Sequence, residues 1–282
     1  MTYVLVRHGD AEEFLARAEP WLLSREAEHN LHLSLAYARR EKGDAEPDCL
    51  FGTVECDGEV VGGVMRTPPH KLLLTGMPTD AAPVVAEAAA DLYDAIPAVL
   101  GPADAAEAVA TAWVAVRGGS WHPGMRQRIY RLDEVVPARP VSGELRLATM
   151  DDSDLLEEWG QGFGRDVGHA FYLEADRITN MIDRGHLYIW QDGDPVSMTV
   201  AQGATPNGCR IGYVYTPPEL RGRGYASATV AEVSQRMLDS GMRFCVLYTD
   251  LSNPTSNAIY QKIGYNPIVD VTDVELATPV ST

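Results

Sequence analysis

The segment Arg-Gly-Arg-Gly-Tyr-Ala at residues 221–226 most constrains how this chain can fold. Residues 211–216 before it are β-branched and aromatic and are followed by two prolines, which predicts a strand that ends there. After it, Ala226, Val230 and Val233 recur at the spacing of one helix face. A strand, a glycine-rich turn and a helix start bring free backbone N–H groups and the positive end of a helix dipole to one point. The segment therefore predicts a turn that binds an anionic group.

The residue types in this turn narrow the kind of anion. Gly222 and Gly224 allow a positive φ and a close approach of a ligand to the backbone. Arg221 and Arg223 add charge that can pair with phosphate oxygens. The lysine and hydroxyl pattern of a nucleotide-hydrolysing phosphate loop does not occur here. The alternative is a helix-entry turn whose arginines are solvated and bind nothing.

A second informative pattern occupies residues 253–265. Asn253 is a favoured helix N-cap residue, Pro254 suits the first helical position, and Gly264 ends the predicted helix. Tyr260 points away from the packed stripe of this helix. Taken alone, it is a partly buried tyrosine that packs its ring while its hydroxyl meets water.

Together the two segments resemble motifs of the GNAT N-acetyltransferase family. Arg221-x-x-Gly224-x-Ala226 matches that family's acyl-CoA pyrophosphate motif, arginine or glutamine-x-x-glycine-x-glycine or alanine. Residues 253–265 are similar to its later segment, in which a tyrosine follows an asparagine by seven positions. The resemblance covers roughly residues 143–274. It implies acetyl-CoA as the co-substrate.

The resemblance also implies roles for individual residues. Tyr260 would be the acid that protonates the departing thiolate, since a phenol with a pKa of about 10 is protonated at neutral pH. Asn253 would hydrogen-bond the pantetheine arm. The strand residues that would pair with that arm are Val214, Tyr215 and Thr216. The residues that would hold the pyrophosphate are Arg221, Gly222, Arg223, Gly224, Tyr225, Ala226 and Ser227.

The base that takes the proton of the amine is not identifiable from the sequence. Glu174, Asp250 and His169 fall in suitable regions, but each is an ordinary capping or surface residue on its own pattern. A relay of water molecules along backbone carbonyls is an equal alternative.

Residues 137–143 contain two prolines and a glycine, which predicts a linker between two domains. The predicted fold class is α/β, a mixed sheet with helices on both faces, arranged as two tandem GNAT-like domains. Residues 144–282 would form the catalytic, acetyl-CoA-binding domain. Residues 1–136 would form a degenerate GNAT-like domain that covers or shapes the acceptor site; the alternative is an unrelated α/β cap. In this half the segment 77–80, Met-Pro-Thr-Asp, replaces the arginine–glycine turn.

Both halves are predicted to share one order of elements. In the second half a helix over 172–182 precedes a hairpin of strands 186–190 and 196–201, whose loop Pro195 is expected to lengthen. The first half is predicted to contain a strand at 3–7, helices at 11–23 and 30–40, a hairpin over 50–65, a strand at 72–75, helices at 84–93 and 103–114, and a strand at 126–132.

Composition limits the partners. The net charge of -17 disfavours nucleic acid and anionic membranes and would tolerate a cationic amine, although it also serves solubility alone. The chain has no long apolar run, its first seven residues do not resemble a secretory signal, and its four cysteines have no metal-ligand spacing. We expect a cytoplasmic monomer or homodimer that binds no metal, nucleic acid or membrane.

The function predicted from the sequence is transfer of an acetyl group from acetyl-CoA directly to the primary amine of a small molecule. The alternatives are a non-catalytic acyl-CoA-binding or sensing protein and a transferase that acts on protein amines.

Overall fold

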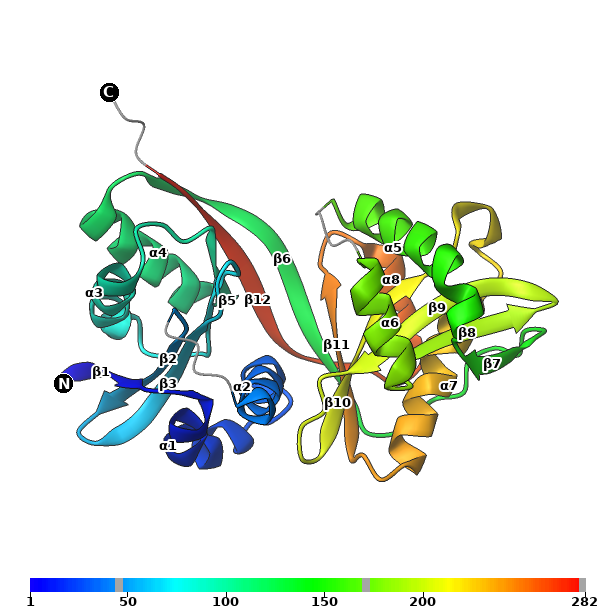
Figure 1. Cartoon of the computed structure of the whole chain (residues 1–282), viewed down its shortest axis with the longest axis horizontal. Coiled ribbons are helices and arrows are strands. Elements are labelled where there is room, and N and C mark those ends of the chain that lie inside the picture. The colour runs from blue at the N-terminus through cyan, green and yellow to red at the C-terminus, as the bar shows by residue number, and fades with distance from the viewer. Residues whose placement is uncertain (44–47, 169–172, 279–282) are drawn as a thin grey trace. The chain divides into compact units, whose positions relative to one another are not determined.

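The computed structural model describes residues 1–43, 48–168 and 173–278. The chain divides into two compact units (Figure 1). Unit 1 consists of Met1–Ile129, Thr249–Ser252 and Ile268–Thr282, and unit 2 of Tyr130–Tyr248 and Asn253–Pro267.

Unit 1 is a mixed sheet with helices on both faces. Its elements are β1 (Tyr3–His8), α1 (Ala11–Leu23), α2 (Asn30–Lys42), β2 (Leu50–Cys56), β3 (Glu59–Arg66), β4 (Leu72–Leu74), the 3-10 turn Thr79–Ala81, α3 (Ala82–Leu92), β5 (Ala98–Pro102), α4 (Ala103–Arg117), β6 (Ser120–Leu132) and β12 (Asn266–Ala277). Strands β1 to β4 pair antiparallel in chain order, and β4 and β5 run parallel. The final strand β12 returns to unit 1 and pairs antiparallel with β5.

Two apolar clusters cover the faces of this sheet. On one face, the alanine-rich helices α3 and α4 pack on residues such as Leu50, Val64 and Val99, because alanine lets a helix approach a sheet closely. On the other face, α1 and α2 bury Phe14 and Leu33 against the remaining side chains. Alternation of inward side chains along the strands supplies both clusters.

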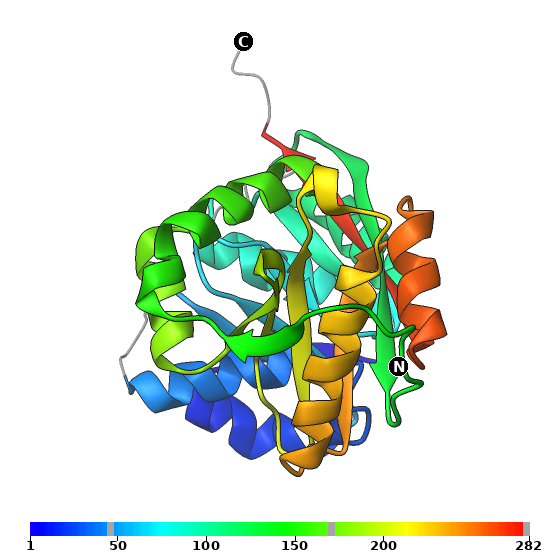
Figure 2. The ribbon, with the colours of Figure 1, turned by 90° about the vertical axis from the view of Figure 1, so that its right-hand side faces the viewer.

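Unit 2 repeats this architecture. Its elements are β7 (Glu144–Leu147), the 3-10 turn Met150–Asp152, α5 (Ser153–Val167), α6 (Ala175–Asp183), β8 (Leu187–Asp192), β9 (Asp194–Gln202), β10 (Gly208–Tyr215), the 3-10 turn Pro218–Leu220, α7 (Tyr225–Asp239), β11 (Phe244–Asp250) and α8 (Pro254–Lys262). Strands β7, β8, β9 and β10 pair antiparallel in that order, and β10 pairs parallel with β11. Figure 2 shows α7, in gold, beside α8, in orange.

The two faces of the unit 2 sheet carry different helices. Helices α7 and α8 bury Ile211, Val233 and Leu247 on one face. Helices α5 and α6 bury Leu156, Ile178 and neighbouring strand residues on the other. We refer to these below as the α7–α8 face and the α5–α6 face.

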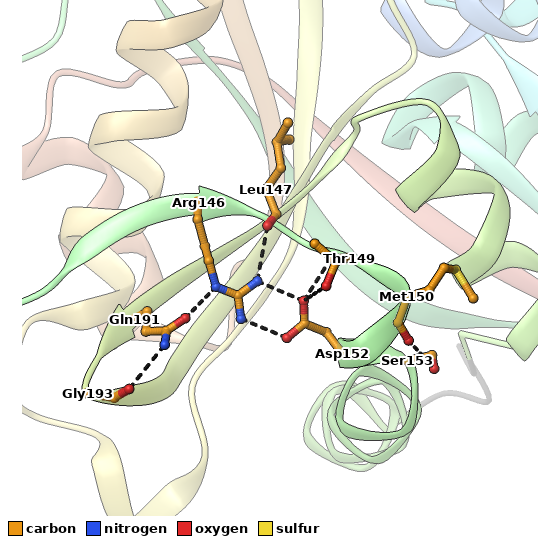
Figure 3. Close-up of polar contacts among 8 residues, drawn as sticks. All are labelled: Arg146, Leu147, Thr149, Met150, Asp152, Ser153, Gln191 and Gly193. Carbon is orange, nitrogen blue, oxygen red and sulfur yellow. Dashed lines mark hydrogen bonds and ion pairs between the residues drawn. The ribbon is translucent and has the colours of Figure 1, made fainter.

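A charged cluster fixes the start of α5 against the sheet (Figure 3). Both terminal nitrogens of Arg146 donate to the carboxylate of Asp152 at 2.7 Å, and its Nε donates to Gln191. The same carboxylate accepts the backbone N–H of Thr149 at 2.8 Å, which completes a capping box. The guanidinium holds the pKa of the Asp152 carboxyl below its usual value. Strands β7 and β8 and the entry to α5 are thus joined through one side chain.

The predicted fold class is confirmed: the chain forms mixed sheets with helices on both faces. The prediction missed β5, placed α6 a little early and expected too long a hairpin loop, since β8 and β9 are separated by Gly193 alone. Residue 172, the predicted start of α6, lies outside the described residues. The predicted boundary at 137–143 falls in the connection from β6 to β7, whereas β12 returns to unit 1. The functional roles assigned to the two domains, 1–136 and 144–282, remain a prediction.

Candidate acyl-CoA site in unit 2

The glycine-rich turn has the backbone conformation that the sequence predicts. Gly222 has φ +78° and Gly224 has φ +94°, both in the region that side chains other than glycine rarely adopt. Gly224 is the N-cap of α7 and receives no side-chain capping bond. The N–H groups in the first turn of an α-helix have no carbonyl partner within the helix. At the start of α7, the backbone N–H of Ala228 donates to the carbonyl of Gly224, so the N–H groups before Ala228 belong to that first turn. Residues 221–224 are exposed, so the turn that leads into α7 lies at the surface of the protein.

Several side chains of the turn already have partners. Arg221 donates from Nε to the carbonyl of Thr216 at 2.9 Å and from a terminal nitrogen to Asp166 on α5. Arg223 donates to the carbonyl of Glu219 at 3.2 Å. These contacts are exposed and contribute little on their own, so a phosphate group can replace the Asp166 partner of Arg221.

The side chain of Tyr225 is directed away from the turn. Its hydroxyl donates to Asp192 at 2.6 Å, and the same carboxylate accepts the hydroxyl of Ser142. Tyr225 therefore offers a ligand only its backbone N–H. Ala226 and Ser227 follow it in the first turn of α7 and are half-buried.

Strands β10 and β11 separate beside this turn. Among the described residues their register ends at Arg210↔Val246, although both strands continue beyond that pair. The backbone of β10 is also irregular there: Tyr213 has φ +51°, and its register with β9 shifts between Gly212 and Tyr215. The β11 side of residues 211–215 is thus left open for an added extended chain.

The predicted strand residues lie at this opening. Val214 is half-buried and packs on the α7–α8 face, whereas Tyr215 is buried on the α5–α6 face. The carbonyl of Tyr215 accepts the hydroxyl of Ser197 at 3.0 Å, and that hydroxyl also lies 2.9 Å from the hydroxyl oxygen of Thr216. The end of β10 is therefore held in place from β9.

Helix α8 carries the other two predicted residues. Asn253 is its N-cap, and its side-chain oxygen accepts the backbone N–H of Ser256 at 3.0 Å. Tyr260 is buried in the α7–α8 cluster, edge-to-face with Tyr265 at 6.1 Å between ring centroids. Burial raises the pKa of Tyr260 to about 12, so its hydroxyl keeps its proton at neutral pH. No described residue forms a hydrogen bond with that hydroxyl, which leaves its proton available to a ligand.

The three candidate bases are not drawn together. Glu174 is the exposed N-cap of α6. Asp250 accepts the backbone N–H and the hydroxyl of Ser252, each at 2.7 Å, and so supports a turn. His169 lies outside the described residues.

Two arginines that the sequence analysis did not single out belong to the α5–α6 face. Arg177 lies in the first turn of α6, and Arg210 stands at the last parallel pair of β10 and β11. In the sequence, Arg210 could have been noticed as a charged residue within an otherwise apolar strand. No comparable sequence pattern marks Arg177.

Two kinds of feature were sought in the described residues: a metal-binding cluster and a membrane-spanning helix. Within the described ranges, no group of three or more His, Cys, Asp or Glu side chains is placed to hold a metal ion. In the same ranges, no helix is long and apolar enough to cross a membrane.

Comparison with known proteins finds one family model and several solved structures that match this chain. Residues 151–265 match the model of the acetyltransferase (GNAT) family. The solved structure of a Drosophila protein superposes with a TM-score of 0.71 at 12% identity, covering 98% of this chain and 99% of the other. A comparison with curated proteins returned no match.

Two further solved structures that match this chain are described as GNAT proteins. A GCN5-related N-acetyltransferase from Sphaerobacter thermophilus has a TM-score of 0.61 at 17% identity, covering 98% of this chain and 96% of the other. A tandem GNAT protein from the clavulanic acid biosynthesis pathway has a TM-score of 0.56 at 14% identity and covers 99% and 100%. At these identities the likeness shows the fold. The chain therefore carries a GNAT-family domain at residues 151–265. Its whole length has the fold of the tandem GNAT protein.

Proposed function

We propose that this protein transfers the acetyl group of acetyl-CoA directly to the primary amine of a small molecule, in unit 2. The observation that supports this best is the exposed turn with two left-handed glycines at the start of α7, beside the separated ends of β10 and β11. Acetyl transfer is the general activity of the family whose model matches residues 151–265.

The residues present fit acetyl-CoA as a substrate. The N–H groups at the start of α7 and the guanidinium groups of Arg221 and Arg223 suit a pyrophosphate, which binds at helix N-termini for the same reasons. A ligand can approach the backbone of Gly222 closely, because no heavy atom lies within 4 Å of the position that a Cβ on this glycine would occupy. The pantetheine amides can pair with the open edge of residues 211–215 as an added strand would.

Tyr260 supplies the acid in this proposal. A neutral amine attacks the thioester carbonyl carbon, a carbon–nitrogen bond forms, and the carbon–sulfur bond breaks. The departing sulfur takes the proton of the Tyr260 hydroxyl. The amine releases its own proton to solvent, and the Tyr260 phenolate takes a proton from solvent, which restores the phenol. Burial keeps the phenol protonated until the sulfur departs. Positioning of amine and thioester would supply much of the remaining acceleration.

The described residues of unit 1 lack the features that support a cofactor site in unit 2. A Cβ on Gly101 would stand 2.9 Å from both Cβ and the carbonyl oxygen of Leu74, so β4 and β5 remain in close contact there. The segment after β4 forms a 3-10 turn with Asp80 in it, and this carboxylate would repel phosphate. We propose that unit 1 does not bind acetyl-CoA.

The test combines binding with turnover. Calorimetric titration with acetyl-CoA, free CoA and ATP should show binding of the first two and none of the third. Release of free thiol over a panel of small amines and amine-bearing peptides then separates the alternatives. Binding without thiol release for any amine would indicate an acyl-CoA sensor, and release with peptides alone would indicate a protein acetyltransferase. Preference for ATP would overturn the proposal.

A further inference from the structure

Strand β10 of unit 2 contains a β-bulge at the place where it separates from β11. The register between β9 and β10 shifts between Gly212 and Tyr215, so that two residues of β10 stand opposite Thr199 alone. Tyr213, the first of these two, has φ +51°, a conformation that is strained for a bulky residue. A bulge bends and twists its strand, and the regular pairing of β10 with β11 ends just before it, at Arg210. The bulge thus explains why β10 turns away from β11.

Two hydroxyl groups on β9 bond to the residues that border the bulge. The hydroxyl of Thr199 donates to the carbonyl of Gly212 at 3.0 Å, and the hydroxyl of Ser197 donates to the carbonyl of Tyr215 at 3.0 Å. Ser197 and Thr199 are each 0% exposed, and a buried hydroxyl is stable only when it has a partner. Backbone strain of the kind seen at Tyr213 persists only where the surrounding structure holds it in place. The two hydroxyls supply such a constraint on each side of the strained residue.

Ser197 also connects the bulge to the glycine-rich turn. Its hydroxyl oxygen lies 2.9 Å from the hydroxyl oxygen of Thr216, and the carbonyl of Thr216 accepts the Nε–H of Arg221 at 2.9 Å. Residues on β9 therefore fix both the open edge of β10 and the first residue of the turn proposed to bind the pyrophosphate.

Unit 1 provides an internal comparison. Its last regular pair between β3 and β4 joins Val64 to Leu74, and the residue before Val64 is Gly63, which has no hydroxyl. The chain continues here with a regular contact, in which the N–H of Thr75 donates to the carbonyl of Gly63 at 3.0 Å. Strand β4 also remains close to β5, since a Cβ on Gly101 would stand 2.9 Å from Leu74. Where β3 offers no hydroxyl at this position, the neighbouring strand does not bulge and does not open.

We propose that Thr199 and Ser197 are positioning residues for acetyl-CoA in unit 2. Their hydroxyls hold β10 in the bulged form that leaves residues 211–215 free to pair with the pantetheine arm. Both side chains are fully buried, so they act through the backbone of β10 and not by contact with the ligand. The inference rests on the proposed transferase function and adds two residues to it.

The experiment compares threonine variants at the two ends of β10. Thr199→Val removes the hydroxyl at nearly constant volume, and Thr199→Ser keeps it. Thr205→Val is the matched control, because Thr205 is also buried and its hydroxyl donates at 3.1 Å to the carbonyl of Gly208, at the opposite end of the same strand. Urea unfolding should show similar losses of stability for the two valine variants, since each loses one buried hydrogen bond.

CoA affinity should separate the same variants. The Kd from calorimetry and the KM for acetyl-CoA should both rise about tenfold in Thr199→Val, the change expected for the loss of one well-placed hydrogen bond. Thr199→Ser and Thr205→Val should bind CoA as the wild-type protein does. Ser197→Ala, a smaller change, should weaken binding in the same direction, and it provides the comparison with Thr205→Val if Thr199→Val does not fold.

The outcomes separate this inference from the proposed function. Absence of CoA binding by the wild-type protein would overturn the transferase, and the positioning role with it. If the wild-type protein binds CoA, unchanged affinity in Thr199→Val and Ser197→Ala would overturn the positioning role alone. An equal loss of affinity in Thr199→Val and Thr205→Val would do the same, because it would show a general effect of destabilisation. A loss in Thr199→Ser as large as that in Thr199→Val would also contradict the proposal, since the hydroxyl would then not be the group that matters.

Discussion

Replacement of Tyr260 by phenylalanine tests catalysis and packing separately, because a neighbouring tyrosine provides a matched control. The hydroxyl of Tyr260 has no hydrogen-bond partner among the described residues, so its loss should change the free energy of unfolding by less than about 0.5 kcal/mol. Loss of the acid should lower kcat about 100-fold, which corresponds to about 2.7 kcal/mol in the barrier.

Tyr265→Phe should give the reverse result. The two rings pack edge-to-face, but the hydroxyl of Tyr265 is fully buried and lies 2.8 Å from the hydroxyl oxygen of Ser234. Its removal leaves that buried serine without this bond, which costs about 1–2 kcal/mol in the free energy of unfolding. Because Tyr265 is not proposed to contact the thioester, kcat should remain near that of the wild-type protein.

The assays are thiol release at saturating acetyl-CoA and urea unfolding of both variants. Retention of the wild-type kcat in Tyr260→Phe would refute the acid role. A loss of more than 1 kcal/mol in unfolding free energy for that variant would show that the hydroxyl serves the fold. The pH dependence is a further check. Since burial raises the pKa of Tyr260 to about 12, the wild-type rate should show no loss of an acidic group at pH 10, where an ordinary phenol would be half ionised.

Two further predictions concern stability. Burial lowers the pKa of His29 to about 4 and that of His32 to about 3, so both contribute stability that is complete above pH 6.5 and is lost as the pH falls toward those values. Each should cost roughly 2 kcal/mol of unfolding free energy at pH 5, and a urea midpoint unchanged between pH 7.5 and 5 would contradict this. Arg146→Ala removes the double hydrogen bond to Asp152 and leaves that carboxylate buried, at a cost of about 2–3 kcal/mol. Arg146→Lys should recover part of the loss in the same assay, and equal stability of all three proteins would show that the cluster does not hold α5.

Local patterns accounted for much of the fold. The turn at residues 221–227 and the cap at Asn253 depend on residues within one turn of the chain, so the sequence predicted their backbone conformation directly. Strand β5 was missed because its five residues include glycine and proline and stand between two alanine-rich helices. The return of β12 to unit 1 is a long-range pairing, and short-range periodicity carries no information about it.

In the candidate site, too, some features follow from local sequence and others do not. The residues that we propose to bind phosphate are consecutive, so the sequence pattern shows them directly. In contrast, the irregular backbone at Tyr213, which brings its ring to the α5–α6 face, was not predicted. Nothing in a strand of β-branched and aromatic residues marks one position for a positive φ.

The most direct test of the account is CoA binding by glycine variants at the two ends of α7. Gly224 and Gly241 have φ of +94° and +105°, so Gly224→Glu and Gly241→Glu carry similar backbone strain and the same added charge. A Cβ on Gly224 would also meet Val141 at 3.0 Å, whereas nothing lies within 4 Å for Gly241, so circular dichroism should first establish that both variants are folded.

Isothermal titration calorimetry with CoA then gives the decisive comparison. If the pyrophosphate binds at the start of α7, Gly224→Glu should weaken binding by at least about 100-fold, or roughly 2.7 kcal/mol, through repulsion and lost backbone contacts. Gly241→Glu should bind CoA as the wild-type protein does. Equal affinities for the two folded variants would contradict the site in unit 2 and the transferase that depends on it.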